Sequence, residues 1–125
     1  MKKIFRGFLK NNLEERTTNF SKKVVIFLKT IKKDNLSLPL INQLVRSATS
    51  IGANYFEAGG ACSKKDFKNK IYICKKECRE TKYWLEILAE AHPESKNICR
   101  ELWKEAHELT LIFSKTILTL ENKKR

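Results

Sequence analysis

The chain has 125 residues and a mass of 14.6 kDa, the size of one domain with one hydrophobic core. Apolar residues make up 42% of it and charged residues 32%, which excludes a disordered tail and an integral membrane protein. The 26 Lys and Arg residues outnumber the 14 Asp and Glu residues by 12. An excess that large on so small a domain favours a polyanionic partner.

The first ten residues are basic, and their apolar run is interrupted by Arg6 and Lys10. A signal peptide needs an apolar core of about 7–15 residues, and a membrane-spanning helix needs about 20. Neither occurs here or later in the sequence. We therefore expect a cytoplasmic protein that has no contact with a membrane.

Helix-breaking residues divide the chain into four stretches, each long enough for a helix. The first runs from about Glu14 to Lys33 and has apolar residues at helical spacing. The second opens at Ser37, a residue type that caps helices, with Pro39 in the first turn. It ends near Gly59, because glycine is common where helices stop.

The third and fourth stretches have the most regular apolar patterns. Ser63 and Asp66 resemble a capping box at the start of the third stretch, and the fourth follows Pro93. Apolar positions then alternate steps of four and three residues, which is typical of helices packed in a bundle. The third stretch places them at Phe67, Ile71, Cys74, Cys78, Thr81, Leu85 and Leu88. The fourth places them at Leu102, Ala106, Leu109, Phe113, Thr116 and Leu120.

These patterns predict an all-α protein. The connections between the stretches are short, and short connections favour antiparallel neighbours. We therefore predict an antiparallel up-down-up-down four-helix bundle over residues 14–122. A basic N-terminal segment, residues 1–13, precedes it, and a basic tail, residues 123–125, follows it.

No motif for catalysis, a metal or a cofactor appears in the sequence. A di-metal carboxylate site in a helical bundle needs Glu-x-x-His on two helices, and neither His92 nor His107 has that spacing. Gly59-Gly60 lacks the Gly-Lys-Ser/Thr of a phosphate-binding loop. We therefore expect no enzymatic activity, no metal and no cofactor.

Cys74 and Cys78 lie one helical turn apart on the apolar stripe of the third stretch. Zinc sites usually offer two cysteines separated by two residues, and the chain has no such pair. Free cysteine behaves as a small apolar residue, so we expect core packing. A metal site, redox chemistry and a disulfide are the alternatives.

Cations and tyrosines share the side of the third stretch that faces away from its apolar stripe. They are Lys65, Lys68, Tyr72, Lys76, Arg79 and Tyr83. Cations with tyrosines between them are suited to hold a phosphate backbone and to stack on bases. A subunit interface and a solvated outer face are the alternatives.

The first stretch adds a second group of cations. Residues 21–46 contain six Lys and Arg against one acid, Asp34, and residues 1–12 contain four against none. Binding to nucleic acid through such charges depends strongly on salt and weakly on sequence. We add four lysines of this group to the candidate nucleic-acid-binding residues: Lys22, Lys23, Lys29 and Lys33.

Polar residues form a separate set on the second and third stretches. They are Arg46, Ser50, Asn54 and Glu57 on one face of the second, and Glu77 and Glu80 on the third. If such groups are partly buried, they must satisfy one another. We expect a structural hydrogen-bond network between helices, with a ligand site as the alternative.

Two runs, Gln43–Ala58 and Lys76–Leu85, resemble signatures of the bacterial four helix bundle protein family, which includes proteins encoded in intervening sequences of 23S rRNA genes. The resemblance extends over about residues 14–120. It implies an antiparallel four-helix bundle that assembles into a ring, a homopentamer, without enzymatic activity. It also implies kinship with accessory proteins of diversity-generating retroelements, which bind a reverse transcriptase and nucleic acid.

The charge and the resemblance lead to one functional hypothesis. We expect a non-enzymatic homo-oligomeric ring that binds RNA or DNA electrostatically. The first alternative is an accessory adaptor of a diversity-generating retroelement that binds a reverse transcriptase together with its template RNA. A structural protein without a tight ligand is the second.

Overall fold

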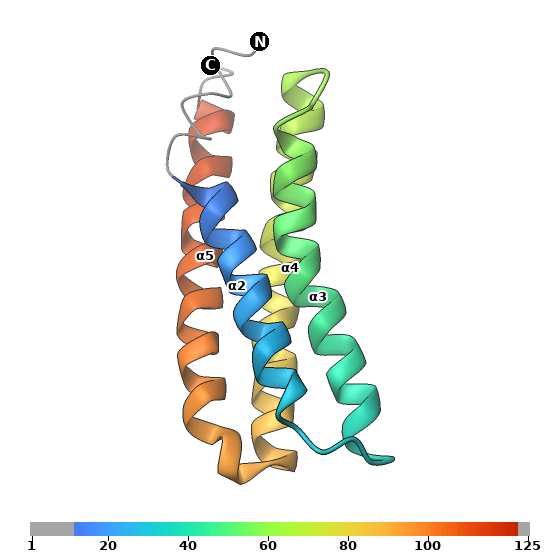
Figure 1. Ribbon diagram of the computed structural model, residues 1–125. Helices are drawn as coiled ribbons and strands as arrows, with labels where there is room; N and C mark the ends of the chain where they lie inside the picture. Colours follow the sequence, from blue (N-terminus) through green and yellow to red (C-terminus); the bar gives the residue numbers. More distant parts are fainter. Residues whose placement is uncertain (1–11, 123–125) are drawn as a thin grey trace.

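A computed structural model describes residues 12–122 of the chain. Within that range it contains four α-helices and one short 3₁₀ turn, in the order α2 (Leu13–Lys29), α3 (Ser37–Ala58), α4 (Lys64–Ala91), η1 (Pro93–Ser95) and α5 (Lys96–Asn122). Each helix runs antiparallel to the one before it (Figure 1). The predicted all-α four-helix bundle is confirmed. Residues 1–11 and 123–125, most of the two predicted basic segments, lie outside the described range.

The four helices do not contact one another equally. α4 packs closely on both α3 and α5, and α2 packs on α3, whereas α2 touches α5 only lightly. α2 and α4 are diagonal neighbours across the core (Figure 1). The outer sides of these two helices therefore point in opposite directions.

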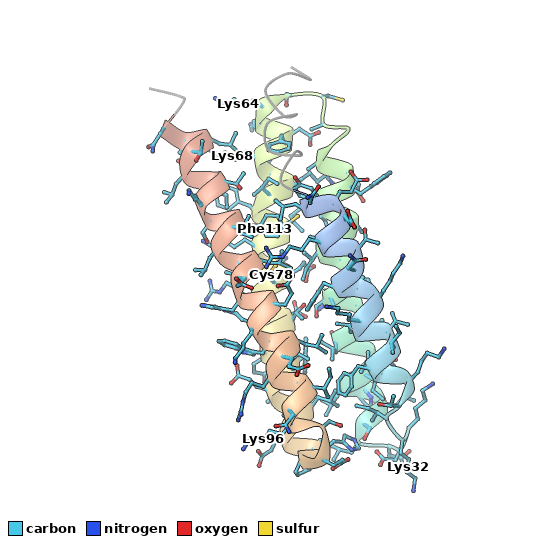
Figure 2. The ribbon with its side chains drawn as sticks, turned by 60° about the vertical axis from the view of Figure 1, so that its left-hand side comes forward. Lys32, Lys64, Lys68, Cys78, Lys96 and Phe113 are labelled. Atoms are coloured by element: carbon cyan, nitrogen blue, oxygen red, sulfur yellow. The ribbon has the colours of Figure 1, made fainter. Side chains whose placement is uncertain are left out.

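The predicted apolar stripes form the core. All seven stripe positions of α4 are buried, and on α5 the stripe is buried at every predicted position except Thr116, where Ile117 takes its place. Tyr55 of α3 meets Phe113 of α5 across the centre, with ring centroids 5.9 Å apart. Figure 2 shows Phe113 and Cys78 inside the bundle. Core packing of Cys74 and Cys78 is thus what the structure shows.

The connection between α2 and α3 differs from the prediction. α2 ends at Lys29 rather than at Lys33, and the Thr30 hydroxyl donates to the Phe27 carbonyl 2.6 Å away. Asp34 rather than Ser37 caps α3: its carboxylate accepts from the Ser37 backbone N–H at 2.8 Å, which lowers the pKa of Asp34. The loop thus supplies the cap that the helix itself lacks.

Ser37 and Ser63 make side-chain hydrogen bonds at the starts of α3 and α4. Ser37 is buried, and its hydroxyl is hydrogen-bonded to His92 Nε2 beside η1. The Ser63 hydroxyl accepts from the Asp66 backbone N–H at 3.0 Å, as the capping box predicts. The Asp66 carboxylate accepts from the Cys62 N–H rather than from Ser63. The bond from Asp66 to Ser63 satisfies a backbone donor that the start of α4 leaves open.

A polar cluster joins α3 to α4. Glu77 is only 8% exposed and accepts a hydrogen bond from the Ser50 hydroxyl at 3.2 Å. Arg46 pairs with both Glu77 and Glu80, and the Asn54 amide donates to Ser50. Five of the six residues in the predicted polar set therefore lie together, because they share the α3–α4 seam.

Glu57, the sixth member of the predicted set, lies apart from that cluster. Its carboxylate pairs with Lys70 Nζ at 2.7 Å, about one turn further along α3 than Asn54. The hydrogen bond to Glu57 raises the pKa of Lys70. Within residues 12–122, every buried side-chain nitrogen and oxygen has a hydrogen-bond partner. The α3–α4 cluster thus leaves no polar atom aimed at a missing ligand.

Replacing Glu77 with alanine should lower the free energy of unfolding by about 1–3 kcal/mol, because Arg46 and Ser50 lose a buried partner. Urea denaturation measures the change. Glu108→Ala is the matched control, since the Glu108 side chain is 65% exposed and its pairing with Arg16 is screened by water. That variant should change stability by less than about 1 kcal/mol. Equal effects of the two substitutions would show that the cluster adds no stability.

The burial of the cysteines predicts how fast each of them is chemically modified. Cys74, Cys78 and Cys99 are buried and Cys62 is exposed. Burial raises the pKa of Cys74 to about 12 and that of Cys99 to about 11, and it raises the pKa of Cys78 as well. Because the thiolate is the reactive form, iodoacetamide at mildly alkaline pH should modify Cys62 quickly and the other three slowly.

Mass spectrometry of intact protein counts the modified cysteines over time. Denaturant should make all four cysteines react at similar rates, which provides the control. Rapid modification of a second cysteine in the native protein would contradict the burial of the thiols.

Candidate nucleic-acid interface

The basic stripe predicted on the third helix lies on the outer side of α4. Lys65, Tyr72, Lys76, Arg79 and Tyr83 are all exposed, opposite the buried stripe of the same helix. Tyr72 is 42% exposed and Tyr83 is 55% exposed, which is unusual for large aromatic side chains. The stripe therefore presents cations and ring faces to the solvent together.

One end of this stripe is partly neutralised by α5. The Tyr72 hydroxyl donates to Glu121 at 2.7 Å, and that hydrogen bond raises the pKa of Tyr72. Lys68 lies half-buried with its Nζ 3.9 Å from the same carboxylate. Lys68 and Tyr72 are thus positioned by Glu121, whereas Lys76 and Arg79, further along α4, line a surface pocket with Glu80, whose carboxylate pairs with Arg46.

α5 supplies further cations that the sequence analysis missed. Arg100, Lys104 and Lys115 are exposed on its outer side, and Lys96 stands at its first turn. Figure 2 places Lys96 at the end of the bundle away from Lys64 and Lys68. Arg100, Lys104 and Lys115 lie opposite the apolar stripe of α5, so helical spacing in the sequence already indicates their exposure.

Aromatic and charged side chains close the outer seam between α4 and α5. The rings of Trp103 and His107 stack with centroids 5.1 Å apart and an interplanar angle of 16°. Lys82 of α4 reaches over the Trp103 ring, 5.2 Å from its centroid, and its Nζ lies 3.1 Å from His107 Nδ1. Trp103 Nε1 donates to Glu86 at 3.2 Å. These contacts join the two outer sides into one continuous surface.

We call this surface the α4–α5 face. Its cations are Lys64, Lys65, Lys68, Lys75, Lys76, Arg79, Lys82, Lys96, Arg100, Lys104 and Lys115, and its carboxylates are Glu86, Glu90, Glu101, Glu108 and Glu121. That is eleven against five, a net charge of +6, whereas residues 12–122 together carry 19 cations and 14 acids, a net charge of +5. The rest of the described chain is therefore slightly acidic.

The cations predicted on the first helix are not part of this face. Lys22, Lys23 and Lys29 lie on α2, and Lys33 lies in the loop that follows it. Because α2 and α4 are diagonal neighbours, the two predicted groups point away from each other. One subunit cannot bring both groups to the same straight strand.

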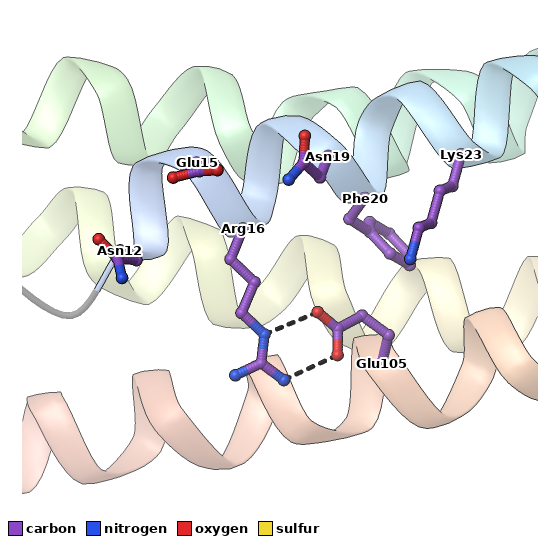
Figure 3. Close-up of a pocket in the computed structure, with 7 residues that line it drawn as sticks. All are labelled: Asn12, Glu15, Arg16, Asn19, Phe20, Lys23 and Glu105. Carbon is purple, nitrogen blue, oxygen red and sulfur yellow. Dashed lines mark hydrogen bonds and ion pairs between the residues drawn. The ribbon is translucent and has the colours of Figure 1, made fainter.

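A pocket between α2 and α5 contains another cation, Arg16. Its guanidinium donates to both oxygens of Glu105 at 2.7 Å (Figure 3). It also donates to Glu108 at 3.1 Å. The hydrogen bond to Glu105 is the main reason that the pKa of Arg16 is raised. Two carboxylates already neutralise this cation, so the pocket joins α2 to α5, the neighbouring helices with the lightest contact, and is not an anion site.

Residues 12–122 contain no group of three or more His, Cys, Asp and Glu side chains positioned to hold a metal ion. None of the helices between these limits is long and apolar enough to cross a membrane.

Comparison with known proteins places the chain in context. The family described as 23S rRNA-intervening sequence protein matches residues 10–115. No curated protein matches the chain. The chain resembles a crystal structure of a protein with unknown function from the S23 ribosomal protein family of Bacteroides thetaiotaomicron. That resemblance has 31% sequence identity and a TM-score of 0.76, and it covers 83% of this chain and 96% of that one.

The family match spans most of the chain, including all of α2, α3 and α4 and most of α5. The sequence runs that resemble the four helix bundle proteins fall within it, on α3 and α4. The chain belongs to the 23S rRNA-intervening sequence protein family.

Proposed function

We propose that this protein is a non-enzymatic nucleic-acid-binding protein that holds the phosphates of RNA or DNA on its α4–α5 face. The observation that carries the proposal is the net charge of +6 on that face, against a slightly acidic remainder of the described chain. The family, named for an intervening sequence of ribosomal RNA, supports a nucleic-acid-related role.

The dimensions of the face suit a phosphate backbone. α4 has 28 residues and α5 has 27. At about 1.5 Å per residue each helix extends for about 40 Å, so its cations are spread over several turns. Binding would release the counterions that the phosphates hold, which makes affinity strongly dependent on salt.

Side-chain pairing separates cations that are available to a ligand from those that are not. Arg16, Arg46 and Lys70 each pair with a carboxylate. Within residues 12–122, Arg79 and Arg100 have no carboxylate partner. Arginine of this kind meets phosphate with two parallel hydrogen bonds. We therefore assign the strongest phosphate contacts to the α4–α5 face.

We further propose that the protein acts as a homo-oligomeric ring, the homopentamer that the sequence resemblance implies. Leu111 and Leu118 are 56% and 63% exposed on the outer side of α5, and a neighbouring copy would bury them. Five copies, each with a net charge of +12, carry a formal +60. Such a ring gains avidity from several weak contacts with one strand.

The same two leucines favour a second candidate function. An exposed apolar pair among cations is also suited to dock another protein, and the resemblance names a reverse transcriptase with its template RNA as such a partner. A reverse-transcriptase gene beside the gene for this chain, and copurification of the two proteins, would favour this adaptor role over direct nucleic-acid binding.

The combined variant Lys76→Ala, Arg79→Ala and Arg100→Ala tests the nucleic-acid proposal. Log affinity falls as log salt rises, and on duplex DNA each phosphate contact adds about 0.9 to the steepness of that fall. The steepness should therefore decrease by about 2–3 in this variant. Affinity at low salt should fall at least tenfold. Fluorescence anisotropy with a labelled duplex of mixed sequence measures both quantities.

A variant with the same loss of charge on the opposite side provides the control. Lys22→Ala, Lys29→Ala and Lys32→Ala remove three cations from α2 and its loop. We expect the affinity of this control for the duplex to change by less than about twofold. Absence of binding by the unmodified protein even at low salt would refute the proposal, and an equal loss in both variants would refute the assignment to the α4–α5 face.

The ring proposal predicts that Leu111→Ser combined with Leu118→Ser lowers the mass of the particle. Both side chains are exposed, so the bundle itself should remain folded, which circular dichroism verifies. Light scattering after size exclusion measures the mass, with a nuclease and high-salt wash applied to remove bound nucleic acid. A monomeric unmodified protein would contradict the ring.

A further inference from the structure

An open groove lies between α4 and α5 at the end of the bundle that carries η1. Its floor is apolar and is formed by Leu85, Ala89, Pro93, Cys99 and Trp103. The groove has a volume of about 610 Å³, which is within the range of small-ligand sites. The room and the apolar floor suit a flat organic group rather than a bare ion.

The two rims of this groove carry opposite charge. Lys96, Arg100 and Lys104 line the α5 side, and Glu86 and Glu90 line the α4 side. A ligand that complements both rims has an anionic group on one side and hydrogen-bond donors on the other. A nucleotide has both, because its phosphates are anionic and the amino groups of its base donate.

Trp103 supplies the surface on which a base would lie. His107, one turn further along α5, stacks on one side of the indole ring. Lys82 Nζ, which is hydrogen-bonded to His107, lies 5.2 Å from the centroid of the same ring. The indole also lines the groove, together with Cys99 and Arg100 one turn before it. The bond from Nε1 to Glu86 holds the indole in this orientation.

We propose that this groove binds an unpaired base of a single-stranded nucleic acid, stacked on Trp103, with the flanking phosphates on Arg100 and Lys104. The inference rests on the proposed function and adds a preference to it. A duplex keeps its bases paired and stacked, so it meets only the cations of the α4–α5 face. A single strand meets the cations and the groove together.

Fluorescence of Trp103 tests the proposal directly. Trp84 is the other tryptophan, and it is bonded to Glu80 at the α3–α4 seam, away from the groove. A Trp84→Phe background therefore leaves Trp103 as the reporter. We expect a single-stranded RNA to quench this fluorescence and a duplex of the same sequence to bind without quenching it.

Affinity changes in variants provide the second readout. Stacking of a base on an aromatic ring is worth about 1–3 kcal/mol, so Trp103→Leu should weaken single-strand binding roughly 5- to 150-fold. Ala89→Leu leaves the ring in place and fills the groove, and it should have the same effect. Both variants should change duplex affinity less than twofold. Phe56→Leu, an exposed aromatic residue on α3, is the matched control and should change neither affinity.

Each contrary result has a distinct meaning. Single strand and duplex could both bind with the expected salt dependence while neither groove variant changes the ratio of single-strand affinity to duplex affinity. That result overturns the groove proposal and leaves the proposed function standing. If Ala89→Leu lowers the mass of the particle, the groove is a contact between copies, which also overturns it. If neither nucleic acid binds at low salt, the proposed function fails and the groove proposal fails with it.

Discussion

The buried stripe of α4 positions the rest of the bundle. It packs against α3 on one side and α5 on the other, so α4 is held along its whole length while its remaining side chains are directed outward. Burial of apolar surface is the main favourable term in such packing. Since the stripe is unbroken from Phe67 to Leu88, it fixes the rotation of the helix about its axis. The outer cations of α4 are aligned as a consequence of that rotation.

The two flanks of α4 differ in chemistry, and the difference separates structure from candidate function. On the α3 side, Glu77 and Glu80 neutralise Arg46 in a satisfied cluster close to the core. On the α5 side, Lys82, Trp103 and His107 meet at a surface that stays open to water. Charges of the first kind hold helices together, whereas those of the second kind are available to a ligand.

α2 is the least integrated helix. It has 17 residues, fewer than the other three, and it contacts α5 only lightly. Arg16 compensates for this through its paired bonds with Glu105, and Gly52 of α3 allows close approach on the other side, since an added Cβ would lie 3.4 Å from the Thr17 carbonyl oxygen. Lys22 of α2 lies toward α3, away from the candidate site, whereas Lys23 lines the pocket between α2 and α5 together with Glu105.

The sequence by itself determined the number of helices, their buried stripes and the place of Cys74 and Cys78 in the core. Those features follow from spacing along the chain, because residues three and four apart share one side of a helix. The sequence also pointed to five of the six polar residues at the α3–α4 seam, since two helices with facing polar positions must satisfy each other. Capping was less readable, because Asp34 acts from outside the helix that it caps.

Only the tertiary structure decided which charges share a surface. Arg16 and Glu105 are 89 residues apart, and nothing in their local spacing predicts that they pair. The cations of α2 and α4 look equivalent in the sequence, yet the diagonal placement of the two helices separates them, while the cations of α5 join those of α4. The physical reason is that the order of helices around a core depends on how all the buried stripes pack together. Spacing within one helix does not contain that information.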